Sequence, residues 1–150
     1  MSPAPLADLP LIGHPLYRLN LNRLVVLKMA REHVYSEPNW LAGERLAAKL
    51  AVTRAPGARH SSARFVTGRL DRARSRDEFL GLVRKADKPT LVIYGAETPM
   101  RSRLEIEALE HLPKIRIERL PKGKLLIHEE FPQAVAPLIR QFLMQTTCNP

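Results

Sequence analysis

The stretch PTLVIYGAETP, residues 89–99, decides the fold class. Its run from Thr90 to Tyr94 is rich in β-branched and aromatic residues, carries no charge, and is closed by Gly95. An uncharged apolar run of this length is typical of a strand that is covered on both faces, as strands of parallel sheets usually are. The stretch therefore predicts a buried strand of a parallel sheet.

The residues that follow predict a helix and a second strand. Ser102 and Glu105 have the spacing of a capping box, and the apolar residues behind them predict a helix that ends at Pro113. Residues 115–120, IRIERL, alternate between apolar and charged side chains, as expected of a strand nearer to the edge of a sheet. Strand, helix and strand in this order form a βαβ unit, and a last helix is predicted to begin near Pro132.

The half of the chain before Pro89 is predicted to be helical. Residues 19–35 carry a wide apolar stripe, and Ser36 is the predicted N-cap of a second helix, with Pro38 in its first turn. Ser75, followed by Glu78, has the capping-box spacing and predicts a third helix. The chain is thus expected to be an α/β protein with a helical front half.

Composition narrows the classes of function. The chain has 150 residues, the size of one domain, and a net charge of +9. Its densest basic run, residues 69–76, has no interleaved aromatic residues, so a solvated helix face is favoured over nucleic-acid binding. The histidines fall at no metal-ligand spacing, and neither a metal nor a cofactor is expected. With one cysteine, Cys148, no secretory signal and no membrane-spanning run, the sequence indicates a cytoplasmic protein.

The order of these motifs is similar to that of a known family. PTLVIYGAETP, then a helix, then IRIERLPKGKLLIHEEFPQAVAPLIRQFL resembles the C-terminal end of α/β-hydrolase fold proteins, and most closely their esterase/lipase-like branch found in cyanobacteria and plastids. The resemblance implies a partial hydrolase fold, in which a helical cap precedes the last two parallel strands in a βαβα segment. It implies an N-terminal extension over residues 1–15, a cap-like region over 16–88, the βαβα segment over 89–145 and a tail over 146–150.

Catalysis in this family needs a serine on a G-x-S-x-G turn, followed along the chain by an acid and a histidine. None of the seven glycines brackets a serine in this way, so the nucleophile is absent from the sequence. The family's acid position corresponds to Thr98, which leaves Glu97 as the candidate acid. His128 matches a histidine of the family that is often only structural. It is the candidate base, although a role in capping or packing the last helix is favoured.

The expected function follows from the missing nucleophile. The chain is expected to be an α/β-hydrolase-family protein that lacks the nucleophile half, as a truncated product or one piece of a split enzyme, without hydrolase activity by itself. Its full-length relatives would hydrolyse ester or similar acyl bonds, and the cap would leave room for an apolar small-molecule ester. The alternative is a non-catalytic binding module that self-associates or pairs with a companion chain that completes the sheet.

Overall fold

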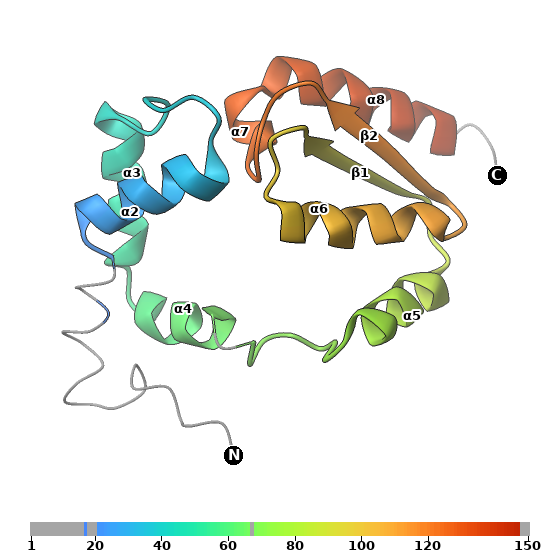
Figure 1. Ribbon diagram of the computed structural model, residues 1–150, viewed down its shortest axis with the longest axis horizontal. Helices are drawn as coiled ribbons and strands as arrows, with labels where there is room; N and C mark the ends of the chain where they lie inside the picture. Colours follow the sequence, from blue (N-terminus) through green and yellow to red (C-terminus); the bar gives the residue numbers. More distant parts are fainter. Residues whose placement is uncertain (1–16, 18–20, 67, 148–150) are drawn as a thin grey trace. The chain divides into compact units, whose positions relative to one another are not determined.

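The computed structural model describes residue 17, residues 21–66 and residues 68–147 (Figure 1). The chain divides into two compact units, one built from Met1–Ala30 and Leu41–Arg72, the other from Arg31–Trp40 and Ala73–Pro150. The predicted extension over residues 1–15 lies outside the described residues, as do Cys148 and the end of the predicted tail.

The first unit is helical. It contains α2 (Arg23–Met29), α3 (Gly43–Thr53) and α4 (Ala58–Val66), and its buried apolar residues include Ala30, Leu41 and Leu46. After α2 the chain continues through a short π-helix, η2 (Ala30–Val34), so the apolar stripe predicted as one helix is two consecutive helical segments. The predicted N-cap at Ser36 is wrong, because α3 begins only at Gly43, after Ala42.

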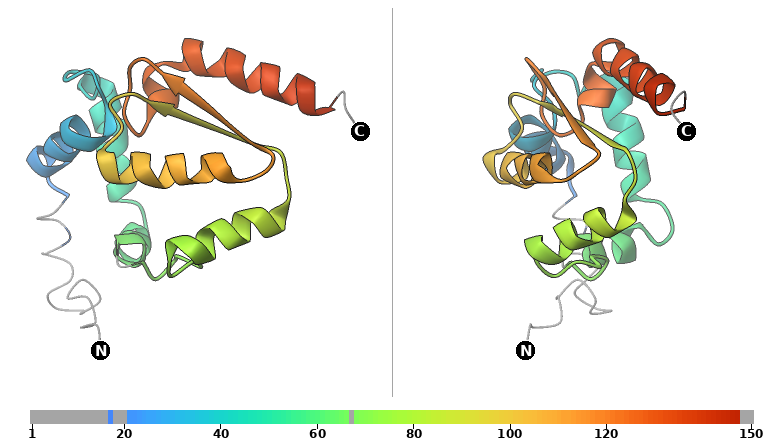
Figure 2. Two further views of the ribbon diagram at one scale, coloured as in Figure 1. Left: turned by 45° about the vertical axis from the view of Figure 1, so that its right-hand side comes forward. Right: turned by 90° about the vertical axis from the view of Figure 1, so that its right-hand side faces the viewer.

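The second unit carries the sheet. It contains α5 (Arg76–Ala86), β1 (Thr90–Gly95), α6 (Met100–Glu107), the 3-10 helix η3 (Ala108–His111), β2 (Ile115–Leu120), α7 (Ile127–Glu130) and α8 (Pro132–Thr147). β1 and β2 pair in parallel, from Thr90 opposite Ile115 to Gly95 opposite Leu120. Figure 2 shows α6 and α8 on opposite sides of this two-stranded sheet. The predicted α/β class and the βαβ order are confirmed.

The two predicted capping boxes had different outcomes. Ser75 is the N-cap of α5, and its hydroxyl accepts a hydrogen bond from the Glu78 amide at 3.2 Å. Ser102 caps nothing, because α6 already begins at Met100, directly after Pro99. Pro99 has a φ of −51° and an extended ψ, so it ends the loop and lets the next residue start the helix.

The sheet is less covered than the sequence predicts. Of β1 only Tyr94 and Gly95 are buried, whereas Thr90 to Ile93 are half-buried. Two strands have two outer edges and little area, so the flanking helices cannot enclose them as they would enclose a central strand. The expectation that the TLVIY run is covered on both faces is therefore wrong for its first four residues.

Candidate functional site

The candidate site lies where β1 and β2 end. The carboxyl ends of parallel strands lie at one edge of a sheet, and ligands of open α/β sheets bind there. The loop after β1 is held against the loop after β2, because the Ala96 amide donates to the Leu120 carbonyl at 2.9 Å and the Glu97 amide donates to the Gly123 carbonyl at 3.0 Å. This edge carries both candidate site residues, Glu97 and His128.

The two loops approach each other closely at two glycines. A Cβ built on Gly95 would lie 2.6 Å from the Cα of Gly123, well inside the contact distance of two carbon atoms. Gly123 has a φ of +113°, which residues with a Cβ rarely adopt. Both positions therefore require glycine, and together they fix the approach of the loops at the site.

A segment far away in the sequence binds α7 and the loop after β2. Residues 31–40, here called the anchor segment, bind two adjacent glutamates of α7. The Tyr35 hydroxyl donates to Glu129 Oε2 at 2.7 Å. The backbone amides of Ser36 and Glu37 donate to Glu130 Oε2 and Oε1 at 3.0 Å and 2.6 Å. Both oxygens of one carboxylate thus bind two successive amides, an arrangement that fixes the backbone of the anchor segment.

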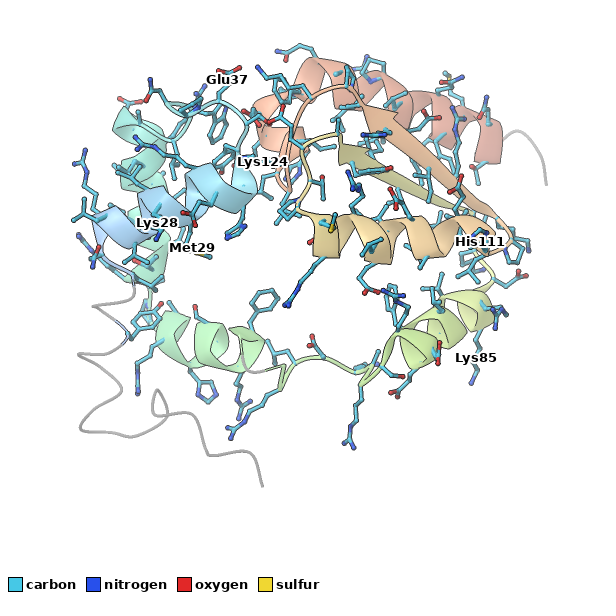
Figure 3. All side chains as sticks on the ribbon, in the orientation of Figure 1. Lys28, Met29, Glu37, Lys85, His111 and Lys124 are labelled. Atoms are coloured by element: carbon cyan, nitrogen blue, oxygen red, sulfur yellow. The ribbon has the colours of Figure 1, made fainter. Side chains whose placement is uncertain are left out.

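Two lysines of the loop after β2 add to this attachment. Lys124 Nζ donates to the Arg31 carbonyl at 2.5 Å, and Lys122 forms an ion pair with Glu37; Figure 3 labels both Lys124 and Glu37. The hydrogen bond with Glu37 raises the pKa of Lys122 above its ordinary value, and the negative charges of Glu37, Glu97 and Glu130 act in the same direction. The loop is therefore a mixed cluster in which one ammonium group faces three carboxylates.

The anchor segment is also internally ordered. The rings of Tyr35 and Trp40 stack with their centroids 4.2 Å apart, and Arg31 Nε donates to the Pro38 carbonyl at 3.2 Å. Tyr35 is only 3% exposed. A turn that stacks a buried tyrosine on a half-buried tryptophan has a fixed shape, and Ser36 lies in this turn and not at the start of a helix.

Among the described residues, neither a hydrogen bond nor an ion pair joins the candidate base to the candidate acid. His128 is exposed on α7, and Glu97 is exposed in the loop after β1. With the other described residues, His128 forms neither a hydrogen bond nor an ion pair, and no hydrogen bond joins its ring to Glu97. Within the same residues no serine hydroxyl shares a hydrogen bond with a histidine.

Two hydroxyl groups in this region are buried and have no partner among the described residues. They are Ser36 Oγ in the anchor segment and Thr98 Oγ1 in the loop after β1. Thr98 is 5% exposed, and its amide donates to the Gly95 carbonyl at 3.0 Å in a tight turn. A buried hydroxyl without a partner costs about 1–3 kcal/mol, so each of these groups favours an additional acceptor or donor beside it.

Sequence reasoning missed the anchor segment. The N-cap prediction put Ser36 at the start of a helix. A signal was present in retrospect, since the turn residues Ser36 and Pro38 interrupt the apolar stripe. Nothing in that pattern indicates that the amides of Ser36 and Glu37 bind Glu130. These two residues lie 94 and 93 positions from Glu130 along the chain.

Comparison of the sequence with models of known protein families and with curated proteins found no match. In the described part of the chain, His, Cys, Asp and Glu side chains form no group of three or more that could hold a metal ion. None of the described helices is both long enough and apolar enough to cross a membrane.

Proposed function

We propose that this chain is the cap-and-edge part of an α/β hydrolase, and that β1 accepts a neighbouring strand from outside these 150 residues. By itself it does not turn over esters. The serine and the oxyanion-hole amides come with the incoming strands, which carry the nucleophile half in this family. His128 is the candidate base of the assembled site, and Glu97 is its candidate acid.

The unpaired edge of β1 is the observation that carries this proposal. Within the described residues, β1 has one neighbour, β2. The amides of Thr90 and Ala96 donate to the carbonyls of Lys114 and Leu120, at 2.9 Å each. Because the amides of a strand point alternately to its two sides, those of Leu91 and Ile93 face away from β2. They are free to pair with another strand.

The energetics of the sheet agree with an added strand. An isolated two-stranded hairpin is at most marginally stable, and a sheet gains stability from further strands or from packing against helices, as α6 and α8 provide here. Apolar side chains of the covering helices stay partly in water: Leu104 of α6 is 49% exposed and Leu143 of α8 is 54% exposed. Additional strands would extend the sheet, and the surfaces of the helices that they covered would gain roughly 25 cal/mol per Å² of apolar area.

Hydrogen exchange tests the state of this edge. In the chain alone, the Leu91 and Ile93 amides should exchange about tenfold or more faster than those of Val92 and Tyr94, which bond to β2. Nuclear magnetic resonance resolves the four amides. In a complex that completes the sheet, Leu91 and Ile93 should become as protected as their neighbours. Equal protection of all four amides in the monomeric chain would show that the edge is already occupied.

Hydrolysis of a nitrophenyl butyrate ester tests the catalytic part. The 150-residue chain should show no turnover that depends on His128. The comparison is between His128→Ala and His111→Ala, which removes an exposed histidine of η3. Turnover by the unmodified chain that is lost in the first variant and kept in the second would contradict the proposal.

The second candidate function is a binding module that uses the same edge without any hydrolysis. Light scattering, which measures the oligomeric state, distinguishes this function from the first proposal. A stable stoichiometric oligomer of the chain that dissociates in Ile93→Pro would favour the module, because the proline removes an outward amide and leaves the β1–β2 hydrogen bonds intact. A clean monomer would favour the first proposal.

A further inference from the structure

The first unit contains a cavity of about 840 Å³ that plays no part in the proposal above. It lies between the start of α2, the end of α3 and the start of α4, three helices that Figure 1 labels. Its volume falls within the range of about 300–1,000 Å³ that is typical of small-molecule sites.

The charged side chains that line this cavity are basic. Arg23, Arg54 and Arg59 line it together with His60, and none of the lining residues is an aspartate or a glutamate. Three guanidinium groups around one space repel each other, and they lower the free energy of an anion that enters it. The charge pattern of the cavity is thus that of an anion site.

Two of these arginines lie where a positive charge does not stabilise the helix that carries it. Arg23 is the first residue of α2, and Arg59 lies in the first turn of α4; neither first turn contains an acidic residue. A cation near the start of a helix is unfavourable, because the positive end of the helix dipole lies there. Arg54 differs, since it caps the end of α3, where a cation stabilises the helix. A ligand that pairs with Arg23 would offset this cost at the start of α2.

The remaining wall is largely apolar. Leu21 and Leu50 line the cavity together with Tyr17, whose hydroxyl donates to the Thr53 carbonyl at 3.2 Å. This hydrogen bond ties the chain before α2 to the end of α3 and directs the polar end of the ring to the backbone, so the ring itself is available for apolar contact. The site therefore combines an apolar wall with a basic one.

We propose that this cavity binds a phosphate monoester that carries an apolar tail. A phosphate monoester carries close to two negative charges at neutral pH and three strong acceptor oxygens, which match several guanidinium groups better than a single carboxylate does. Arginine forms paired hydrogen bonds with phosphate oxygens. The tail lies against Leu21, Leu50 and the ring of Tyr17.

The test is a titration of the full chain with hexyl phosphate, followed by nuclear magnetic resonance at the backbone amides and the His60 ring. Saturable shifts that cluster at the lining residues are expected, with a dissociation constant of about 1 mM or lower. Inorganic phosphate should bind about tenfold or more weakly, because it lacks the tail. No saturation by about 10 mM hexyl phosphate, or equal affinity for inorganic phosphate, would overturn the proposal.

Two triple variants distinguish binding at the cavity from non-specific attraction of the anion by the positive charge of the chain. Arg23→Gln with Arg54→Gln and Arg59→Gln should weaken hexyl phosphate binding about tenfold or more. Arg84→Gln with Arg101→Gln and Arg140→Gln removes the same charge from the second unit, and it should leave the affinity within about twofold. Equal weakening in both would overturn the proposal.

Circular dichroism checks that the helices are kept in each variant. Leu50→Glu is a further variant, which should abolish binding because it places a carboxylate in the cavity wall.

Discussion

Single residues decide how the two loops of the candidate site meet, and Gly95 is the clearest case. A methyl group at this position would overlap the backbone of Gly123, which cannot rotate away as a flexible side chain could. Gly95→Ala should therefore destabilise the second unit by about 2–3 kcal/mol, as overpacking of a close contact does. Denaturant unfolding followed by circular dichroism measures the change.

Gly81 provides the matched control. It lies inside α5, and a Cβ added there would meet nothing within 4 Å. Gly81→Ala should raise stability by about 0.5–1 kcal/mol, since alanine has the higher helix propensity. The two substitutions add the same methyl group to the same unit, so equal effects of both would contradict the close approach of Gly95 and Gly123.

A second prediction at the residue scale concerns the ion pair between α5 and α6. Arg76 donates to Glu105 from Nε at 2.9 Å and from Nη2 at 2.6 Å. The hydrogen bond from Arg76 lowers the pKa of the Glu105 carboxyl below its ordinary value. Any stabilisation by this pair is therefore present above the ordinary pKa of glutamate and is lost as the pH falls through the lowered value.

Arg76→Gln should raise the pKa of Glu105 toward its ordinary value. A titration of the Glu105 carboxyl carbon by nuclear magnetic resonance measures the shift. Arg84→Gln, which removes a charge at the other end of α5, should leave that pKa unchanged. If Glu105 titrates at its ordinary pKa in the unmodified chain, the ion pair does not form in solution.

At the scale of helices and strands, the serines of the two predicted capping boxes should respond differently to substitution by alanine. Ser75→Ala should lower stability by about 1 kcal/mol, because it removes the side-chain acceptor of the Glu78 amide. Ser102→Ala should be neutral or stabilise by a few tenths of a kcal/mol, because Ser102 lies inside α6, where alanine is the better helix former. Thermal unfolding compares the two variants, and a loss in Ser102→Ala as large as in Ser75→Ala would contradict the observed start of α6.

The strands were predictable because their pattern is local. Residues 115–120 were predicted as a strand with the bounds that β2 has, and β1 extends the predicted run only by Gly95. The N-caps were less predictable, since a serine followed by a glutamate is a short pattern and a neighbouring proline can override it. At α6, Pro99 starts the helix before Ser102 is reached. Helix starts depend on such competition between adjacent residues, which periodicity does not reveal.

At the scale of the whole chain, the candidate site was predictable only in part. The strand pattern located the edge of the sheet, and the family resemblance named Glu97 and His128 as candidate residues in the segments that follow β1 and β2. The sequence did not reveal that residues 31–40 bind there, because hydrogen bonds between positions so far apart depend on tertiary structure. The burial of the Thr98 hydroxyl was unpredictable for the same reason, because it depends on how the loop folds and not on the residues next to Thr98 in the sequence.

The anchor segment also has a special place in the chain. The sequence passes from the first unit into the second after Ala30 and returns to the first after Trp40, so residues 31–40 are the part of the chain before Ala73 that belongs to the second unit. Glu130 contributes two of the hydrogen bonds that attach them, because its two oxygens accept from the Ser36 and Glu37 amides. Loss of this carboxylate should therefore loosen the segment while the sheet stays folded.

Glu130→Ala tests this dependence. The variant should destabilise the docked segment by about 1–2 kcal/mol, since hydrogen bonds to a partly exposed charge are individually modest. The Ser36 and Glu37 amides should exchange with solvent about tenfold or more faster, while Val92 and Tyr94 keep their protection. The control is Glu110→Ala, which removes an exposed glutamate of η3. It should leave the exchange rates of all four amides unchanged. Unchanged exchange at Ser36 and Glu37 in Glu130→Ala would show that the lysine contacts and the Tyr35 ring hold the segment without Glu130.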